Sequence, residues 1–541
     1  MNVDPITVNI LGKTLLAGAR EMAANMQRAS YSTVVREARD FSVGILDADG
    51  GVVAQAEMIP MQTGGITEAF RPFRRKIDFA TLTSDDAFIM NDPFDGGQHL
   101  QDIYLFSPIF AGGELLGFGA SVAHHVEVGG GMPGLNALAT EIYQEGIRIP
   151  PTRFSVSRDW NGGFIEEFVR YNVRVPDKVL GDLNAQFAAN ITAVRRVTEL
   201  VERYGIETVR AVMIELQDYS ERRVRDGIGR IPDGVYQAED FVEGTPWGMP
   251  PLKVAATVTV RGSAIAVDFD GTAEQVLANI NCPFASTISA VQGALRGVLD
   301  EKDIPFNEGC NRPLTVSAPY GSLLNPRPPA AVRARMSPAS RAFNAVIRAL
   351  SQAVPERVIA AGFDTTTAVA LSHLETSTGR YGIVIEIIGG GWGAGASHAG
   401  GDGLDNPLSN CSNAPVEALE SECEYFRVHS YQLRPDTGGA GRQAGGRGIE
   451  RSFEALKDGV KFAAYSDRFS FGAGGIFGGE DGGTGAFRVQ RRDGKVEDLP
   501  CAADAVLNRG DIVWVLTGGG GGYGALEPVS GTPAEVEGKP A

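Results

Sequence analysis

Hydrophobic and polar residues alternate along the chain in patterns that predict both helices and strands. Apolar residues recur at spacings of three and four over 8–35, and again in two successive runs over 177–225, which predicts amphipathic packing helices. The stretch FSVGILDADGGVVAQ (41–55) contains two β-like runs around Asp49-Gly50, a common hairpin turn. We therefore expect β-sheets covered by helices.

A second hairpin is predicted just downstream. AFIM (87–90) has the composition of a buried strand, and the runs IYLFSPIF (103–110) and LLGFGASVA (115–123) flank the turn AGGE. Further along, KVAATVTV and AIAVDFDGT form a third hairpin pattern around Arg261-Gly262. A helix is predicted over 285–299, and the proline-rich stretch 311–332 is predicted to be an extended connection.

Glycine dominates the last third of the chain. Apolar β-like runs such as YGIVIEII (381–388) and DIVWVL (511–516) separate the glycine clusters, which we expect to form turns rather than phosphate cradles. The clusters lie at 389–395, 438–441, 445–448, 472–475 and 518–522.

These patterns predict an α+β fold with several layers, β-rich with packing helices and a glycine-rich β region at the C-terminal end. We divide the chain into an N-terminal α+β region that carries the candidate metal site, a helical segment, an α+β middle region and a glycine-rich β region. Their predicted bounds are 1–175, 176–230, 231–380 and 381–541.

Composition and charge exclude several classes of protein. With 541 residues, 43% of them hydrophobic, the chain can bury a large core. Its net charge of −17 argues against nucleic acid or an anionic membrane as a partner. The N-terminal residues show no secretory signal, no apolar run approaches the roughly 18 residues that span a bilayer, and the five cysteines are scattered. We expect a reduced, cytoplasmic protein.

Nucleotide-binding and serine-hydrolase motifs are incomplete. Gly12-Lys13-Thr14 resembles the end of a P-loop, but Thr7 stands where the motif needs glycine. The glycines at 439 and 441 lack the strand and helix of a dinucleotide site, and GASHA (395–399) misses the nucleophile-elbow spacing by one residue. We therefore predict no nucleotide cofactor in this chain.

The richest candidate chemistry surrounds NDPFDGGQHLQD (91–102). His99 and Asp102 lie where one hairpin strand begins, and His124 lies where its partner ends, so these side chains can converge. With Asp40, at a helix-to-strand junction, they form a mixed nitrogen and oxygen set suited to Zn²⁺, Mn²⁺ or Fe²⁺. His125 would point to the opposite side of the strand from His124. In the alternative interpretation, the histidines are satisfied core residues and the aspartates cap turns.

Several segments along the chain form a recognisable series. They include REARDFS (36–42), NDPFDGGQHLQD (91–102), HHVEVGGGMPG (124–134), NVRVPDKVLGDLNAQFAA (172–189), LRPDTGGAGRQAGGRGIER (433–451) and GGGGGYG (518–524). In this order they resemble the hydantoinase B/oxoprolinase family. The family includes β-type subunits of ATP-dependent hydantoinases, 5-oxoprolinase and caprolactamase, and related subunits of acetone and acetophenone carboxylases.

The resemblance implies a reaction divided between two subunits. A hydantoinase A-type partner would bind ATP and Mg²⁺ and phosphorylate the oxygen of a cyclic amide (a hydantoin, 5-oxoproline or a lactam), within a hetero-oligomer such as α2β2. Water activated by one divalent transition metal in this chain would then attack the phosphorylated substrate. The family's metal ligands correspond to Asp40, His99, Asp102 and His124, while His125 and Glu127 are candidates for orientation or proton transfer.

The chain departs from the family pattern at several positions. Met58 and Gln62 replace the two histidines of the family's HIPVHLG, Gln98 and Gln101 are unusual in the ligand loop, and Glu127 is one methylene longer than the usual aspartate. Two alternatives to a cyclic-amide hydrolase therefore stay open. One is the corresponding subunit of an ATP-dependent ketone carboxylase, and the other is a structural subunit that has lost its site.

Overall fold

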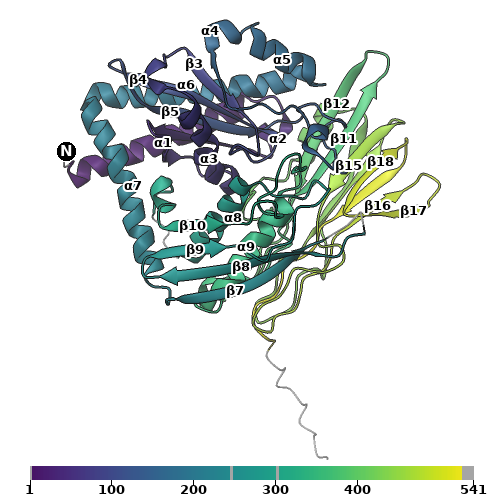
Figure 1. Ribbon diagram of the computed structural model, residues 1–541. Helices are drawn as coiled ribbons and strands as arrows, with labels where there is room; N and C mark the ends of the chain where they lie inside the picture. Colours follow the sequence, from purple (N-terminus) through teal and green to yellow (C-terminus); the bar gives the residue numbers. More distant parts are fainter. Residues whose placement is uncertain (1–2, 244–247, 300–303, 527–541) are drawn as a thin grey trace, which may run out of the picture.

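Four β-sheets and the helices between them make up the part of the protein that the structure describes (Figure 1). The computed structural model describes residues 3–243, 248–299 and 304–526. The α+β fold class predicted from the sequence is confirmed. None of the helices in these described ranges is both long and apolar enough to cross a membrane.

The first sheet is antiparallel and has the strand order β2-β1-β5-β4-β3-β6. The hairpins predicted around Asp49-Gly50 and around the AGGE turn are both confirmed. The strands are β1 (Phe41–Asp47), β2 (Val52–Gln55), β3 (Asp86–Met90), β4 (Asp102–Ala111), β5 (Glu114–His124) and β6 (Thr152–Ser155).

Helices cover both faces of this sheet. On one face α6 (Pro176–Tyr204) packs on β4 and β5, and α1 (Pro5–Ala29) and α7 (Ile206–Ile228) pack beside it. The two helices predicted over 177–225 are therefore confirmed. On the other face lies α3 (Pro60–Lys76), which the sequence patterns did not predict. Its phenylalanines join Phe79, which follows the helix, and those of the strands in one core of Phe70, Phe73, Phe79, Phe88, Phe106 and Phe118.

The predicted helix over 8–35 is wrong at its C-terminal end. Helix α1 stops at Ala29, and a separate short helix, α2 (Thr33–Arg36), follows. The break has a physical cause in Asp182 of α6, whose buried carboxylate accepts hydrogen bonds from the backbone N–H groups of Tyr31 and Ser32 and from the Ser32 hydroxyl. A long-range contact therefore ends a helix that the local pattern would continue.

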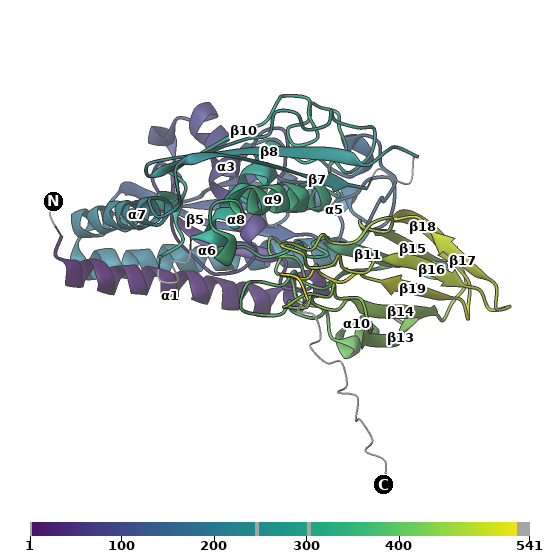
Figure 2. The same ribbon diagram turned by 90° about the horizontal axis from the view of Figure 1, so that it is seen from below.

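The second sheet has the order β10-β9-β8-β7, and Figure 1 shows two helices between it and α3. Its strands are β7 (Gly234–Val242), β8 (Leu252–Arg261), β9 (Ala264–Asp268) and β10 (Leu314–Ser317). Helix α8 (Phe284–Val298), which was predicted, packs against α3, and α9 (Met336–Leu350), which was not, packs on β7 and β8. Figure 2 shows these two helices, α8 and α9, side by side.

The two remaining sheets share one hydrophobic core, to which Phe453, Phe462 and Phe487 contribute. Their orders are β12-β11-β15-β18 and β13-β14-β19-β16-β17. The strands are β11 (Thr367–Glu375), β12 (Arg380–Ile388), β13 (Phe426–Leu433), β14 (Ile449–Ala455), β15 (Val460–Tyr465), β16 (Ala486–Gln490), β17 (Val496–Leu499), β18 (Ala502–Leu507) and β19 (Ile512–Leu516). The short helices are α4 (Val156–Asp159), α5 (Phe164–Asn172), α10 (Val416–Glu422), η1 (Phe79–Thr81), η2 (Ile142–Gln144), η3 (Glu308–Cys310) and η4 (Pro355–Arg357).

The glycine clusters are not turns, so that prediction is wrong. Glycines in 389–395, 438–448 and 518–522 have no positive φ, and these segments run side by side with backbone hydrogen bonds between them. The Gly446 N–H donates to the Trp392 carbonyl (2.8 Å), and the Gly520 N–H donates to the Gly446 carbonyl (2.9 Å). A Cβ at Gly391 or Gly520 would overlap a neighbouring carbonyl oxygen. Glycine is needed here for close backbone approach.

This packing generates a stability prediction. Gly391→Ala should lower the free energy of unfolding by at least about 2 kcal/mol, because its methyl group would overlap the backbone of Gly446. Gly297 lies on the exposed side of α8, and a methyl group added there would have no atom within 4 Å. Gly297→Ala should therefore be neutral or stabilising by up to about 1 kcal/mol. Urea denaturation of both variants measures the difference, and equal stabilities would contradict the close-packing interpretation.

Candidate metal centre

Two histidines and an aspartate meet at one buried point, where β4 begins and β5 ends, with His99 in the loop just before β4. Asp102 and His124 are directly paired across the two strands, because the first residue of one hairpin strand lies opposite the last residue of the other. The Nε2 atom of His99 lies 3.1 Å from Nδ1 of His124. Each of the three side chains offers one ligand atom within 4.8 Å of the others, and all three are buried.

Asp40 borders this group. It precedes β1, and its backbone carbonyl accepts a hydrogen bond from the His124 N–H (3.0 Å). Its carboxylate Oδ2 lies 3.5 Å from Nδ1 of His124. The fourth predicted residue therefore adjoins the other three, although it lies outside their tightest grouping.

Asp102 is the most heavily bonded member. Its side chain has no exposed surface, and its Oδ2 lies 3.0 Å from Nδ1 of His99 and accepts a hydrogen bond from Nη2 of Arg335 (2.7 Å). Its Oδ1 accepts from Nε2 of Gln62 (3.1 Å), which also donates to Oδ1 of Asp40 (2.8 Å). The Gln62 amide thus bridges both carboxylates.

The donor set fits a divalent transition metal. Ligand nitrogens on a tetrahedral zinc ion, each about 2.0–2.1 Å from it, are roughly 3.3 Å apart, close to the 3.1 Å between the two imidazoles. A proton on Nδ1 of His99 would be held by Asp102, which leaves the Nε2 lone pair directed toward His124. The two carboxylates add oxygen ligands of the kind that zinc, manganese and iron accept.

Burial and neighbouring charges set the protonation of the centre. Burial, reinforced by the charge of Arg335, lowers the pKa of His99 to about 4, and burial and His99 hold the pKa of His124 well below its ordinary value. Burial and the charge of Asp102 raise the pKa of Asp40 to about 8. Burial alone would raise the pKa of Asp102, but His99 and Arg335 outweigh it and lower that pKa. Both imidazoles are therefore neutral, as metal ligands must be.

His125 and Glu127 contact other parts of the protein. Nε2 of His125 lies 3.0 Å from Oε1 of Gln186 on α6, on the opposite side of the sheet from His124. Glu127 forms an ion pair with Arg174 (2.6 Å) and accepts the Gly129 N–H. The structure places neither side chain in the group formed by His99, Asp102 and His124, and their catalytic role stays a prediction.

The departures from the family pattern fall in different places. Gln62 lines the cavity at the centre, whereas Met58 lines a separate, more open hollow beside α1, with Arg20 and Arg39. Gln98 donates to the Met61 carbonyl (2.7 Å), and Gln101 donates to the Glu145 carbonyl (3.1 Å). Of these four departures, only Gln62 contacts the candidate ligands directly.

Sequence reasoning missed the contributions of distant segments. The cavity walls include Arg335 and Met336 at the start of α9, Thr366 before β11, Ser409, and Tyr465 at the end of β15. An arginine pair in the apolar run AAVRARM (330–336) is the only local sign of the Arg335 contact. The Met61 N–H donates to the Leu408 carbonyl (2.8 Å), which joins α3 to the C-terminal half at the cavity.

Comparisons with known proteins agree with this architecture. The model of the family described as hydantoinase B/oxoprolinase matches residues 4–526. The caprolactamase subunit beta of Pseudomonas jessenii is 30% identical over 96% of this chain and 91% of its own length. The 5-oxoprolinase 1 of Arabidopsis thaliana is 30% identical over 96% of this chain, which spans only 42% of that longer protein.

Solved structures show the same fold. The crystal structure of the ATP-dependent caprolactamase from Pseudomonas jessenii superposes with a TM-score of 0.85 at 28% identity, covering 97% of this chain and 92% of that one. A nucleotide-free acetone carboxylase structure also has a TM-score of 0.85, at 18% identity over 96% of this chain and 76% of that one, and shares the fold. The chain belongs to the hydantoinase B/oxoprolinase family.

Proposed function

We propose that this chain is the metal-bearing subunit of an ATP-dependent cyclic-amide hydrolase that acts on a hydantoin, 5-oxoproline or a lactam. The observation that carries the proposal is the buried meeting of His99, Asp102 and His124, with Asp40 beside them, in a chain of this family. Relatives named as a caprolactamase subunit and as a 5-oxoprolinase support a cyclic amide as the substrate class.

The chain's own residues would hold and tune the centre. His99, His124, Asp40 and Asp102 would hold one zinc, manganese or iron ion, while Gln62 and Arg335 fix the two carboxylates through hydrogen bonds. When bound, the metal would supply Lewis-acid activation of water. His125 and Glu127 are proposed to act by orienting the strand end through Gln186 and Arg174.

A partner subunit would supply the activation that this chain lacks. An amide carbonyl is a poor electrophile, and transfer of a phosphoryl group from ATP to its oxygen turns that oxygen into part of a leaving group. We propose that a hydantoinase A-type partner, with ATP and Mg²⁺, makes this transfer within a hetero-oligomer such as α2β2. The relative named as subunit beta supports the presence of a partner subunit.

Metal binding should depend on His99. His99→Ala removes one ligand and should leave the purified protein with less than about a tenth of the wild-type metal content, measured by inductively coupled plasma mass spectrometry. Asp102→Ala should also lose the metal but lower the melting temperature further, because it leaves the buried Arg335 unpaired. His398, an exposed histidine, provides the control, and His398→Ala should keep full metal content. Wild-type protein without metal, or metal retained in His99→Ala, would contradict the proposal.

Metal affinity should rise with pH. Without metal, Asp40 has a pKa raised to about 8, so below that pH binding must displace its proton. The apparent affinity should therefore rise about tenfold per pH unit up to pH 8 and then level off, because the histidines are already neutral. Competition with a chromogenic chelator between pH 6 and 9 measures this. Asp40→Asn should bind more weakly and without the slope, and a flat wild-type profile would remove Asp40 from the ligand set.

Activity should require the complex and a cyclic amide. The complex of this chain with an A-type subunit should hydrolyse ATP faster when a hydantoin, 5-oxoproline or a lactam is added without bicarbonate. It should also release the ring-opened product. The matched complex with His99→Ala should lose product formation. ATP turnover that needs both a ketone and bicarbonate would contradict the proposed hydrolase function and favour a carboxylase.

A further inference from the structure

Most of the buried arginines whose contacts the structure describes have a carboxylate partner. Arg451 pairs with Glu386 (2.6 Å), and Arg335 with Asp102 (2.7 Å). Arg468 and Arg341 lie 3.3 and 3.6 Å from Asp240, respectively. These pairs compensate the charge that each guanidinium carries into the interior.

Arg333 is different. Its side chain belongs to a residue that is only 3% exposed, and its Nε and Nη2 are buried without a hydrogen-bond partner. Within the ranges that the structure describes, no carboxylate lies within ion-pairing distance of it. A guanidinium does not lose its proton in proteins, so an unpaired buried one is a substantial free-energy cost.

Glu145, which is also buried, does not supply the missing partner. Its Oε1 accepts the backbone N–H groups of Val332 (3.0 Å) and Arg333 (2.9 Å) rather than the guanidinium. Burial raises the pKa of Glu145 to about 7, so its charge is only partly present near neutrality. The positive charge of Arg333 is therefore left without a full counter-charge.

Arg333 lies beside the metal-centre cavity. Its backbone carbonyl accepts a hydrogen bond from the hydroxyl of Tyr465 (3.4 Å), and Tyr465 lines the cavity. Arg335, two residues further on, also lines the cavity, and its Nε is another buried donor without a partner. The side chain of Tyr465 also contacts the Arg333 guanidinium, so the guanidinium lies against a side chain that lines the cavity.

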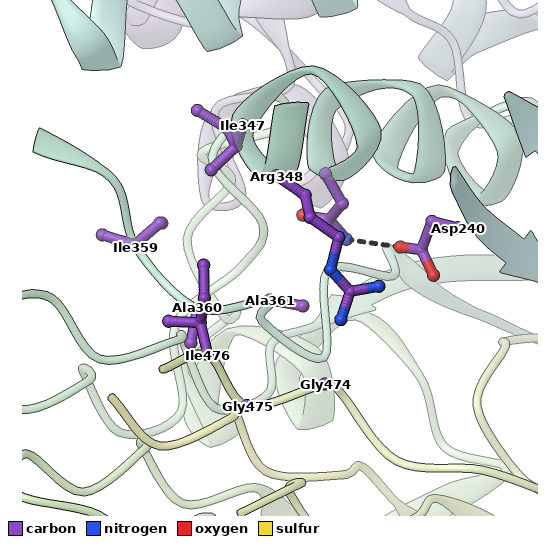
Figure 3. A pocket seen from close by; sticks show the side chains of 10 residues that line it. Asp240, Ile347, Arg348, Ile359, Ala360, Ala361, Gly474, Gly475 and Ile476 are labelled. Carbon is purple, nitrogen blue, oxygen red and sulfur yellow. Dashed lines mark hydrogen bonds between the residues drawn. The ribbon is translucent and has the colours of Figure 1, made fainter. Parts of the chain in front are cut away.

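The cavity around Arg348 provides a contrast. Figure 3 shows Arg348 extending from α9 toward Gly474, with the carboxylate of Asp240 beside it. Asp240 accepts a hydrogen bond from Asn344 (3.2 Å) in the same cavity, and the Arg348 guanidinium donates to the Glu239 carbonyl (3.4 Å). This cavity already contains the carboxylate of Asp240, so Arg348 needs no bound anion as a counter-charge.

We propose that Arg333, with the free Nε of Arg335, forms an oxyanion-binding site beside the metal centre. The planar fork of a guanidinium binds phosphoryl and carboxylate groups through paired hydrogen bonds. Two oxyanions could occupy the site, namely the phosphoryl group placed on the substrate and the carboxylate released when the ring opens. Their identity rests on the proposed function, whereas the site itself rests on the unpaired guanidinium.

Thermal unfolding and calorimetry of the full-length protein with inorganic phosphate and with acetate test the proposal. Either anion, at constant ionic strength set with chloride, should raise the melting temperature saturably, and the tighter of the two identifies the natural group. Arg333→Met should melt at or above the wild-type temperature without added anion, because it removes an uncompensated buried charge. It should also bind the tighter anion at least tenfold more weakly, and Arg333→Lys should fall between the two.

Arg348→Met is the matched control, because it removes an arginine from the other cavity and should leave anion binding unchanged. Failure of both anions to bind the wild type more tightly than chloride would overturn the proposal. So would unchanged binding in an Arg333→Met protein that is folded. Metal content measured on the same samples separates the two proposals, since a metal-free wild type refutes the metal-centre function while the anion titration still decides the role of Arg333.

Discussion

The buried carboxylate of Asp102 is the contact on which the arrangement of the site depends. It meets His99 in the loop just before β4, Gln62 on α3 and Arg335 just before α9. These partners therefore come from the loop that leads into the hairpin, from a helix that covers the first sheet and from a segment more than two hundred residues away. Because a buried charge without partners is strongly unfavourable, the fold must bring all three together before Asp102 can be buried. The same contacts hold the candidate ligands in place.

The centre drives two neighbouring carboxyl groups toward opposite protonation states. Asp102 keeps its charge because His99 and Arg335 face it, whereas burial and the charge of Asp102 raise the pKa of Asp40 and leave it protonated up to a pH of about 8. Two like charges this close are not both stable in a buried site without a cation. A divalent ion between them would remove that conflict. The low pKa values of both histidines complete a site whose nitrogens are ready to accept a cation.

Local patterns predicted the part of the site that one hairpin creates. The alternation of apolar and polar residues in β4 and β5, and the turn between the strands, were enough to place Asp102 opposite His124. They also placed His125 on the other face of the sheet. The patterns could not predict Arg335, Tyr465 or the placement of Gln62, because these reach the site through α3, α9 and β15, whose packing is set by tertiary contacts. The predictions for the end of α1 and for the extended glycine segments were wrong for the same reason. In both cases a distant backbone or carboxylate, absent from the local sequence, determines the conformation.

Gln62 shows how a single side chain can change the centre without changing its ligands. The family pattern has histidine at this position, and an imidazole could donate, accept, carry a charge or bind a metal. The amide of Gln62 donates one hydrogen bond to each carboxylate and stays neutral at every pH. It therefore links Asp40 and Asp102 without adding a proton that titrates near neutrality. Titration near neutrality is then left to Asp40, because the neighbouring arginines keep their charge. In the proposed reaction, Arg333 and Arg335 would supply the positive charge for an anionic substrate group.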